Sequence, residues 1–447
     1  MKALGVIPAN FPQANSFEET RNSMANATAT RTKHPRAKCG CLARQPPQEH
    51  PGEIPFPPTM DNRPKLEAWI KNHFADSAFN TCTHQRLQAM SGKPLEIAFK
   101  EGYIPSAVHC PIPVAHHWKK EVKQAIDADV RLGIIEPVPV GTPTEWCSQM
   151  VVSTKSDGSP RRTVDLQKLN GATMRETHHT PSPFNQVNVI PRSTKKSKLD
   201  AWNVYHSVEL NEESRDATTF ITEWGRYRYL RAPQGFHSSN DGYTRRYDEI
   251  TSGVERATRL VDDSLLWDKD IESAFWHVIE YIKHCADNGV VFNPKKFEFA
   301  RDELEFAGFY VTMDGYRPPE RILKAIRDFP TPTSITGVRS WFGLVNQVAY
   351  TFAQAPVMSP FRDLLASRGT KFVWHANLEH AFTRAKDQIL DQIREGVKTF
   401  EVGRPTCIST DFSKKGIGYT LLQKHCRCLQ KDDPNCGVGH WKLIHAG

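Results

Sequence analysis

The sequence predicts an α+β fold in which antiparallel hairpins are covered on one face by helices. Apolar and polar residues alternate over residues 218–222 and 226–230, on either side of Trp224-Gly225, and this pattern is typical of a hairpin. Apolar residues also recur at spacings of three and four from Ile271 to Cys285, and the run ends at Gly289. The second pattern predicts one amphipathic helix that backs a sheet.

Two further helices are expected toward the C-terminus. One runs from Ile322 to Phe329 and stops before Pro330. The other opens at Ser334 and carries an apolar face that includes Trp341.

The length and the charge are consistent with a protein of several domains that binds a polyanion. The chain has 447 residues, a net charge of +8 and a pI near 8.9, and residues 192–198 are a basic segment. No apolar run approaches the roughly 18 residues of a membrane span, and residues 1–17 lack the pattern of a secretory signal. We therefore expect an intracellular protein of the cytoplasm or nucleus, with no membrane partner. The sequence does not indicate an oligomeric state.

Ten cysteines are spread thinly along the chain, which predicts reduced thiols rather than a disulfide scaffold. The stretch from Cys426 to His440 has enough ligands for zinc. Its spacing fits no standard zinc finger, so we do not expect zinc there.

Two adjacent carboxylates, Asp262 and Asp263, lie within an apolar segment, and a third, Asp200, lies upstream. The apolar β-forming residues around the pair predict a tight hairpin with the acids at its tip, facing a strand that carries Asp200. Three carboxylates within about 4 Å would repel by roughly 1 to 4 kcal/mol per pair, so their convergence requires cations. Two Mg²⁺ ions about 3.5 to 4 Å apart would suit an in-line phosphoryl transfer. Taken alone, an Asp-Asp pair is more often a turn or a solvated surface.

Other motifs stand in a definite order around these acids. They occupy residues 155–170, 200–205, 232–236, 293–297 and 305–309. This order resembles that of reverse transcriptases, specifically the polymerase of gypsy-type long-terminal-repeat retrotransposons, from about residue 80 to residue 428. The resemblance implies a right-hand polymerase with fingers, palm and thumb. It also implies that Asp200, Asp262 and Asp263 are catalytic ligands of two Mg²⁺ ions, with Mn²⁺ as an alternative.

The motif at residues 155–170 looks like the fingers hairpin of the family. By that match, Lys155 and Arg161 hold the triphosphate of the incoming nucleotide. A lysine point charge and an arginine fork beside a Gly-Pro turn suit such a polyanionic group. If the segment stood alone, an ordinary basic surface hairpin would be the better interpretation.

The resemblance assigns further residues to the nucleotide pocket. Tyr205 would block a 2′-hydroxyl, which favours DNA over RNA synthesis. Gln234 and Gly235 would shape the pocket beside the template base. Lys296 is the candidate catalytic residue that protonates the leaving pyrophosphate. The segment 305–309 looks like the primer grip, which positions the 3′-hydroxyl.

The chain departs from the family pattern at two places. Residues 237–242 replace the usual Asn-Ala-Pro turn into a helix, so the entry to the pocket is a weaker match. Leu260 stands where Tyr or Phe is usual before the Asp pair, which leaves the metal chemistry in place.

The expected domain order begins with a mostly flexible extension over residues 1–75. The fingers and palm follow over residues 76–310, and the thumb and connection over residues 311–380. Residues 381–447 resemble a truncated, partial RNase H-like α/β domain, in which Asp411 matches the first metal ligand. One carboxylate cannot hold two metal ions, so we expect no RNase H activity. Because no Asp-Thr-Gly or Asp-Ser-Gly triplet occurs, we expect no protease activity either.

The sequence thus predicts an RNA-directed DNA polymerase, a nucleotidyltransferase fragment of a retroelement polyprotein. Its partners would be an RNA or DNA template with its primer, and dNTPs. Two alternatives stay open at this point. One is an inactive or co-opted remnant that only binds nucleic acid, although all the acids stand intact. The other is an RNA-templated RNA polymerase, which Tyr205 and the lack of a glycine before the Asp pair disfavour.

Overall fold

The structure is a computed structural model, and every described residue belongs to one compact unit, residues 43–447. The described residues are 44–47, 49–82, 87–155, 157–351, 354–366, 372–393, 396–413, 416–425 and 441–446. The short 3₁₀ helices are His116–Trp118, Val204–Ser207, Glu212–Ser214, Asp216–Thr218 and Ala349–Thr351.

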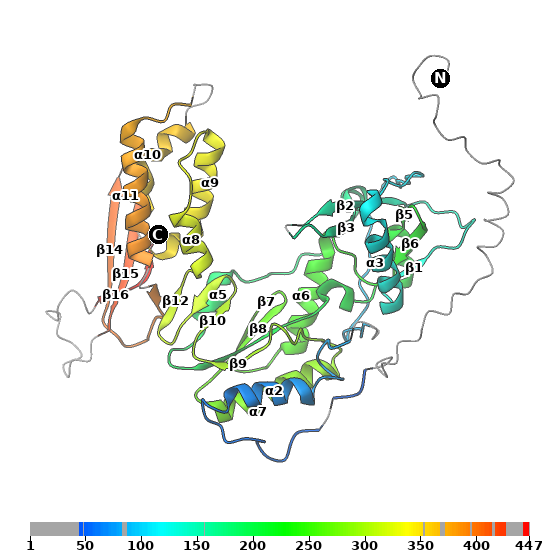
Figure 1. The fold of residues 1–447 in the computed structure, drawn as a ribbon, viewed down its shortest axis with the longest axis horizontal. Helices are drawn as coiled ribbons and strands as arrows, with labels where there is room; N and C mark the ends of the chain where they lie inside the picture. The colour runs from blue at the N-terminus through cyan, green and yellow to red at the C-terminus, as the bar shows by residue number, and fades with distance from the viewer. Residues whose placement is uncertain are drawn as a thin grey trace, which may run out of the picture. The chain divides into compact units, whose positions relative to one another are not determined.

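The centre of the fold is a four-stranded antiparallel sheet in the order β7-β8-β4-β9. Its strands are β4 (Lys195–Asp200), β7 (Ala257–Leu260), β8 (Asp263–Asp268) and β9 (Glu298–Arg301). Helices α7 (Ile271–Asp287) and α2 (Arg63–His73) run beside each other and pack against this sheet (Figure 1). The α+β prediction is therefore confirmed.

Helix α7 forms where its apolar spacing predicts it. It begins with a capping box. The Asp270 side chain accepts from the Ser273 backbone N–H, and the Ser273 side chain accepts from the Asp270 backbone N–H. It ends before Gly289, whose φ of +78° a side chain would strain. A Cβ at Gly289 would also lie 2.0 Å from the carbonyl oxygen of Ala89, so only glycine fits this close approach.

The expectation of a mostly flexible extension over residues 1–75 is wrong for residues 63–73. These residues form α2, and Leu66 and Ile70 are fully buried in the main hydrophobic core. Their spacing of four places both side chains on one face of the helix. The proline-rich composition on the N-terminal side concealed this short apolar face.

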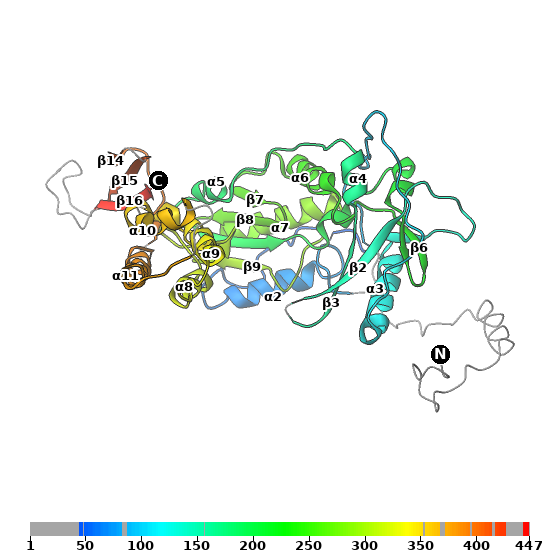
Figure 2. The ribbon, with the colours of Figure 1, turned by 90° about the horizontal axis from the view of Figure 1, so that it is seen from above.

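A second sheet has five strands in the order β1-β6-β5-β2-β3. They are β1 (Ile135–Pro137), β2 (Ser148–Thr154), β3 (Pro160–Val164), β5 (Phe220–Thr222) and β6 (Gly225–Tyr229). The predicted hairpins around Trp224-Gly225 and around residues 155–159 are both present. Helix α3 (Lys119–Leu132) packs beside β1 and β3, and Figure 2 shows it next to β3.

Along the chain, three helices lie between strands of these two sheets. They are α4 (Gln167–Ala172), α5 (Pro183–Asn188) and α6 (His237–Thr251). Helix α6 is polar in sequence, yet eight of its residues are buried, among them Asp241, Thr244 and Arg246. Although residues 237–242 depart from the family pattern, a helix begins at His237.

A group of helices follows the two sheets in the chain. They are α8 (Glu320–Arg327), α9 (Ile335–Asn346), α10 (Gln354–Ala366) and α11 (Ala376–Ile393), and they lie together in Figure 2. The predicted helices at Ile322 and Ser334 are confirmed as α8 and α9, and the Ser334 side chain caps α9. These helices share a core around Trp341 and Phe382. The domain boundary expected at residue 380 falls inside α11, so the helical group extends to Ile393.

The remaining strands form two sheets. The first, in the order β10-β11-β12-β13, consists of Leu304–Phe306, Phe309–Val311, Gly315–Arg317 and Val397–Lys398. The second consists of β14 (Thr406–Ser413), β15 (Gly416–Lys424) and β16 (Trp441–Ala446), all antiparallel. Among the described residues, no helix is both long and apolar enough to cross a membrane.

Candidate active site

The structure brings the three predicted acids together at one end of the central sheet. Asp263 begins β8 and lies directly opposite Asp200, the last residue of β4. Asp262 lies in the tight turn between β7 and β8, after Val261 with its φ of +53°. The backbone N–H of Ala201 donates to the carbonyl oxygen of Asp262 at 2.8 Å, which ties this turn to the end of β4.

A cavity of about 360 Å³ opens at Asp200 and Asp262, and Asp263 is not among the residues that line it. Its wall includes five of the predicted site residues, Asp200, Tyr205, Gln234, Asp262 and Lys296. They come from segments as far apart in the chain as residues 200 and 296. The fold therefore brings these five residues, which the sequence places far apart, to one opening.

Burial and mutual repulsion disfavour the charged forms of the paired acids. Burial, followed by the neighbouring Asp262 and Asp200, raises the pKa of Asp263 to about 6. Burial is also the main cause of a raised pKa at Asp262, with a further contribution from Asp200. A cation beside these groups would reverse both shifts by stabilising the carboxylates.

Lys296 supplies such a positive charge at Asp200. Its Nζ lies 2.6 Å from Oδ2 of Asp200, and this hydrogen bond raises the pKa of the lysine. The Asp200 side chain is 6% exposed, whereas the Lys296 side chain is 56% exposed. The lysine therefore reaches in from solvent to neutralise a buried acid.

The chemistry of the acids fits a hard divalent cation, because Mg²⁺ prefers carboxylate oxygen ligands. Within the described part of the chain, no three His, Cys, Asp or Glu side chains form a ready-made cluster for an ion. The ammonium of Lys296 already holds one carboxylate oxygen of Asp200. A cation that uses this oxygen would have to displace the ammonium.

Tyr205 lies in the short helix Val204–Ser207 that directly follows the Asp200 segment. Its hydroxyl donates to Oδ1 of Asn240 at 3.4 Å, and its ring meets Tyr243 edge-on at 6.3 Å. Burial, with the nearby Asp262, raises the pKa of the phenol. These contacts from α6 hold the ring at the wall of the cavity.

The Gln234-Gly235 turn is held by a residue to which the sequence assigned no role. Gly235 has a φ of +90°, a conformation that favours glycine. Its carbonyl oxygen accepts from Nδ2 of Asn170 at 2.8 Å, and Oδ1 of Asn170 accepts from the N–H of His237 at 3.0 Å. Asn170 thus joins the turn to the first residue of α6. Its place within the motif at residues 155–170 was the only signal in the sequence.

Lys155 and Arg161 do not line the cavity. Both are exposed on the β2–β3 hairpin, where Arg161 in β3 is paired with Ser153 in β2. The turn itself is well formed, since the Lys155 N–H donates to the Ser159 carbonyl at 2.9 Å. The structure therefore places these two residues on one hairpin, and neither lines the cavity at Asp200 and Asp262.

The segment that resembles a primer grip forms a hairpin, β10–β11. Ala307 and Gly308 make its turn with φ of +54° and +84°. Leu304 and Phe306 share a hydrophobic cluster with Leu265 of β8, and Leu260 packs against the same cluster. This packing couples the hairpin to the strands that carry the Asp pair.

Two predicted features lie partly or wholly outside the described residues. Asp411 lies in β14 opposite Gly418, and its side chain is outside the described residues. The cysteine and histidine stretch from Cys426 to His440 is also outside them.

The central sheet, its two covering helices and the acids at one end of its two middle strands are the arrangement of an α+β polymerase fold. Residues 154–311 match the family model described as reverse transcriptase (RNA-dependent DNA polymerase). The chain thus contains a reverse transcriptase domain, and the predicted resemblance to retrotransposon Pol polyproteins is confirmed.

The curated relatives are transposon polyproteins. The chain is 24% identical to the retrovirus-related Pol polyprotein from transposon gypsy of Drosophila melanogaster, over 82% of this chain and 36% of that protein. It is 23% identical to the corresponding polyprotein from transposon 412 of the same species, over 74% of this chain and 28% of that protein. A Schizosaccharomyces pombe transposon Tf2-3 polyprotein is 21% identical over 83% of this chain and 27% of that protein. The chain spans between about a quarter and just over a third of the length of these relatives.

Solved structures confirm the fold. A foamy viral protease-reverse transcriptase dRH in complex with ds DNA superposes with a TM-score of 0.72 at 17% identity, covering 90% of this chain and 69% of that chain. The foamy viral protease-reverse transcriptase in complex with an RNA/DNA hybrid gives 0.69 at 17% identity, covering 89% and 53%.

Proposed function

We propose that the chain is an RNA-directed DNA polymerase that extends a primer 3′-hydroxyl with dNTPs. The observation that carries this proposal is the cavity whose wall combines Asp200 and Asp262 with Tyr205, Gln234 and Lys296. The carboxylates suit metal binding, while the tyrosine and glutamine offer a shaped wall for a sugar and a base. The family model and the transposon relatives support the same activity.

Reverse transcriptases generally use divalent metal ions. We assign Asp200, Asp262 and Asp263 as the residues that would hold two Mg²⁺ ions, for which Mn²⁺ could substitute; we propose no zinc. Bound there, the ions would supply Lewis acidity to the attacking and leaving oxygens of an in-line displacement. The raised pKa of Asp263, near 6, means that this acid is mostly ionised at neutral pH and available for a cation.

Lys296 would act twice in this scheme. Before substrate binds, its ammonium neutralises Asp200 at 2.6 Å. Once released from that contact, the same group is a proton donor at the wall of the cavity, where pyrophosphate departs. Its raised pKa keeps it protonated at neutral pH, as this role requires.

Lys155 and Arg161 would bind the triphosphate after the fingers hairpin moves toward the acids. Closure of a loop around the substrate is common in enzymes of this kind, because it excludes water and completes the site. Tyr205, beside the sugar position, would select deoxyribonucleotides, and Gln234 with Gly235 would shape the base pocket.

The nucleic-acid partner would be an RNA or DNA template annealed to its primer. The net charge of +8 suits such a polyanion, and the foamy viral neighbours were solved with ds DNA and with an RNA/DNA hybrid. An enzyme that consumes these substrates would work inside the cell. We assign residues 76–310 as fingers and palm, the helices up to Ile393 as thumb and connection, and the β14–β16 region as RNase H-like.

The test is extension of a labelled DNA primer on poly-rA with dTTP and Mg²⁺. We expect wild type to extend the primer and Asp262→Asn to lose the activity. Full activity in Asp262→Asn would overturn the assignment of the acids. Salt-sensitive binding of primer-template without extension by wild type would instead favour the alternative of an inactive nucleic-acid-binding remnant.

A further inference from the structure

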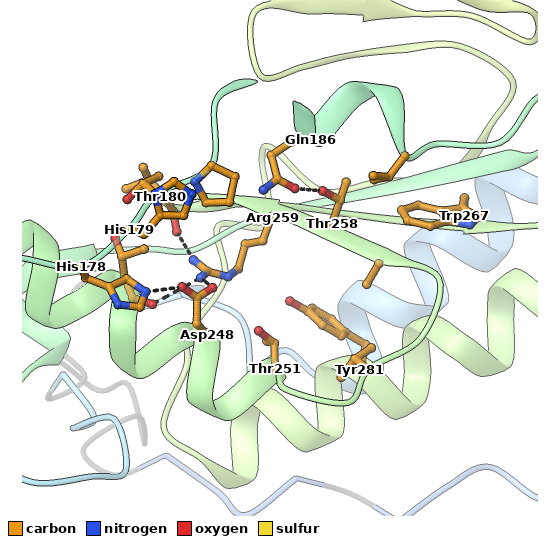
Figure 3. A pocket seen from close by; sticks show the side chains of 16 residues that line it. His178, His179, Thr180, Gln186, Asp248, Thr251, Thr258, Arg259, Trp267 and Tyr281 are labelled. Atoms are coloured by element: carbon orange, nitrogen blue, oxygen red, sulfur yellow. Dashed lines mark hydrogen bonds and ion pairs between the residues drawn. The ribbon is translucent and has the colours of Figure 1, made fainter. Parts of the chain in front are cut away.

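A second cavity, of about 690 Å³, lies against the hairpin that carries the Asp pair. Val261, which precedes Asp262, contributes to the walls of both cavities. Figure 3 shows the Arg259 side chain in this second cavity, extended from the hairpin toward Asp248 of α6, with His178 beside the same carboxylate. Arg259 has no part in the function proposed above.

The guanidinium of Arg259 is buried on one side of the hairpin, and both of its terminal nitrogens have partners there, whereas its Nε has none. Its side chain is 9% exposed and forms an ion pair with Asp248. One of its terminal nitrogens, Nη1, donates to the carbonyl oxygen of Val261 at 2.9 Å. The other, Nη2, donates to the carbonyl oxygen of Thr244 at 3.3 Å. The flat group also lies 4.4 Å from the centre of the Tyr247 ring.

Helix α6 presents a matching face to this arginine. Thr244, Tyr247 and Asp248 are spaced by three and four residues, so they lie on one side of the helix. Together they offer a carbonyl, a ring face and a carboxylate. Only a planar fork with several donors can meet all of these and also reach Val261, which a lysine ammonium cannot do.

The contact with Val261 falls at the most strained point of the turn. Val261 has a φ of +53°, which is unfavourable for a β-branched residue. Both carbonyl oxygens of this turn accept a hydrogen bond. The Val261 carbonyl accepts from Arg259, and the Asp262 carbonyl accepts from the N–H of Ala201. Without the first contact, the strained peptide would relax and Asp262 would lose its fixed direction.

We infer that Arg259 is a positioning residue for the metal site, which holds the Val261-Asp262 turn so that its carboxylate faces Asp200. This inference rests on the proposed function, because it assigns Asp262 to a cation. Arg259 acts through the turn and does not itself touch the cation or the nucleotide. A purely structural role, in which the ion pair with Asp248 only attaches α6 to the sheet, would affect stability but not the metal site.

The experiment measures Mn²⁺ binding by electron paramagnetic resonance, in the absence of nucleotide, for wild type, Arg259→Lys, Arg259→Met and Asp262→Asn. Arg259→Lys keeps a charge for Asp248, so the variant should fold, yet it cannot bridge Asp248 and Val261. We expect both Arg259 variants to bind Mn²⁺ about tenfold more weakly than wild type. Arg245→Met is the matched control, since Arg245 on the same helix pairs with Glu176 and Glu249 and not with the hairpin.

Primer extension on the same proteins supplies a second measure. The Arg259 variants should need more Mg²⁺ for half-maximal extension, with an unchanged KM for dTTP at saturating Mg²⁺, whereas Arg245→Met should match wild type. If wild type binds Mn²⁺ through Asp262 but does not extend the primer, the proposed function is contradicted. In that case the Mn²⁺ affinities of wild type and the Arg259 variants still decide the role of Arg259. Equal Mn²⁺ affinity in wild type and Arg259→Lys, or no Mn²⁺ binding by wild type, would overturn the inference.

Discussion

Asp200 and Asp263 are direct cross-strand partners on β4 and β8. Like charges directly opposite each other destabilise an antiparallel pair. The fold tolerates this repulsion through Lys296, which binds Asp200, and through the raised pKa of Asp263. The pairing therefore has an electrostatic cost that a bound cation would relieve.

Replacing Asp263 by Asn should stabilise the metal-free protein. The amide removes one of two opposed charges while keeping the shape, and we expect a gain of up to about 1 kcal/mol in the free energy of unfolding. Urea denaturation with EDTA present measures it. Asp127→Asn is the control, since the half-buried Asp127 pairs with Lys123 within α3, far along the chain from the acids, and the variant should stay within about 0.5 kcal/mol of wild type. Lower stability of Asp263→Asn would contradict the prediction.

The contribution of Asp263 to the stability of the metal-free protein should fall as the pH rises from about 4 to 7. The pKa of Asp263 is raised from 3.8 to about 6 in the folded state, so the folded protein binds more protons than the unfolded chain in this window. The contribution of Asp263 is therefore fully present below pH 3.8 and is lost as the pH passes 6. Urea midpoints at intervals of half a pH unit test this, with Asp263→Asn as the reference that removes the Asp263 contribution. If the stability of wild type relative to Asp263→Asn instead rose with pH over this window, the prediction would be excluded.

Lys296→Met should slow nucleotide incorporation by about 10²- to 10⁴-fold, the usual contribution of a proton donor. The substitution also leaves Asp200 without its 2.6 Å partner. Pre-steady-state incorporation of a single dTTP measures the rate. Lys295→Met is a matched control, because Lys295 is the neighbouring exposed lysine and does not line the cavity. Equal losses in the two variants would point to general charge rather than to Lys296.

Tyr205→Ala should weaken the discrimination against ribonucleotides on the order of 10- to 100-fold, the range expected when one steric contact is removed. Its ring lines the cavity beside Asp262, held by Asn240 and Tyr243. Tyr205→Phe keeps the ring and should discriminate as wild type does, although it loses the hydrogen bond to Asn240. The ratio of kcat/KM for dTTP and UTP measures the effect. Unchanged ratios in Tyr205→Ala would remove this residue from the sugar pocket.

Leu66→Ala should destabilise the protein by about 2 to 5 kcal/mol, as expected for a large buried side chain. Leu66 in α2 is fully buried in the main core, although it precedes residue 75. Lys65→Ala, at the neighbouring exposed position, should change stability by about 0.5 kcal/mol or less. Thermal unfolding of both variants tests whether residues 63–73 belong to the folded domain. Similar midpoints for the two would contradict the packing of α2.

Much of the secondary structure was predictable because it depends on local pattern. The spacing of apolar residues predicted α7, and alternation around Trp224-Gly225 predicted β5 and β6. The two helices at Ile322 and Ser334 were also expected. By contrast, α6 buries Asp241, Thr244 and Arg246, and polar residues at such positions resemble an exposed helix in the sequence.

The sequence by itself determined the kinds of elements, the order of the motifs and the presence of three acids. The tertiary structure alone decided that Lys296 contacts Asp200 across 96 residues of chain and that Arg259 holds the turn of the Asp pair against α6. It also decided that Lys155 and Arg161 stay outside the cavity wall. The physical reason is that hydrophobic period and turn chemistry act between near neighbours, whereas ion pairs and buried hydrogen bonds depend on which surfaces the packed core brings together.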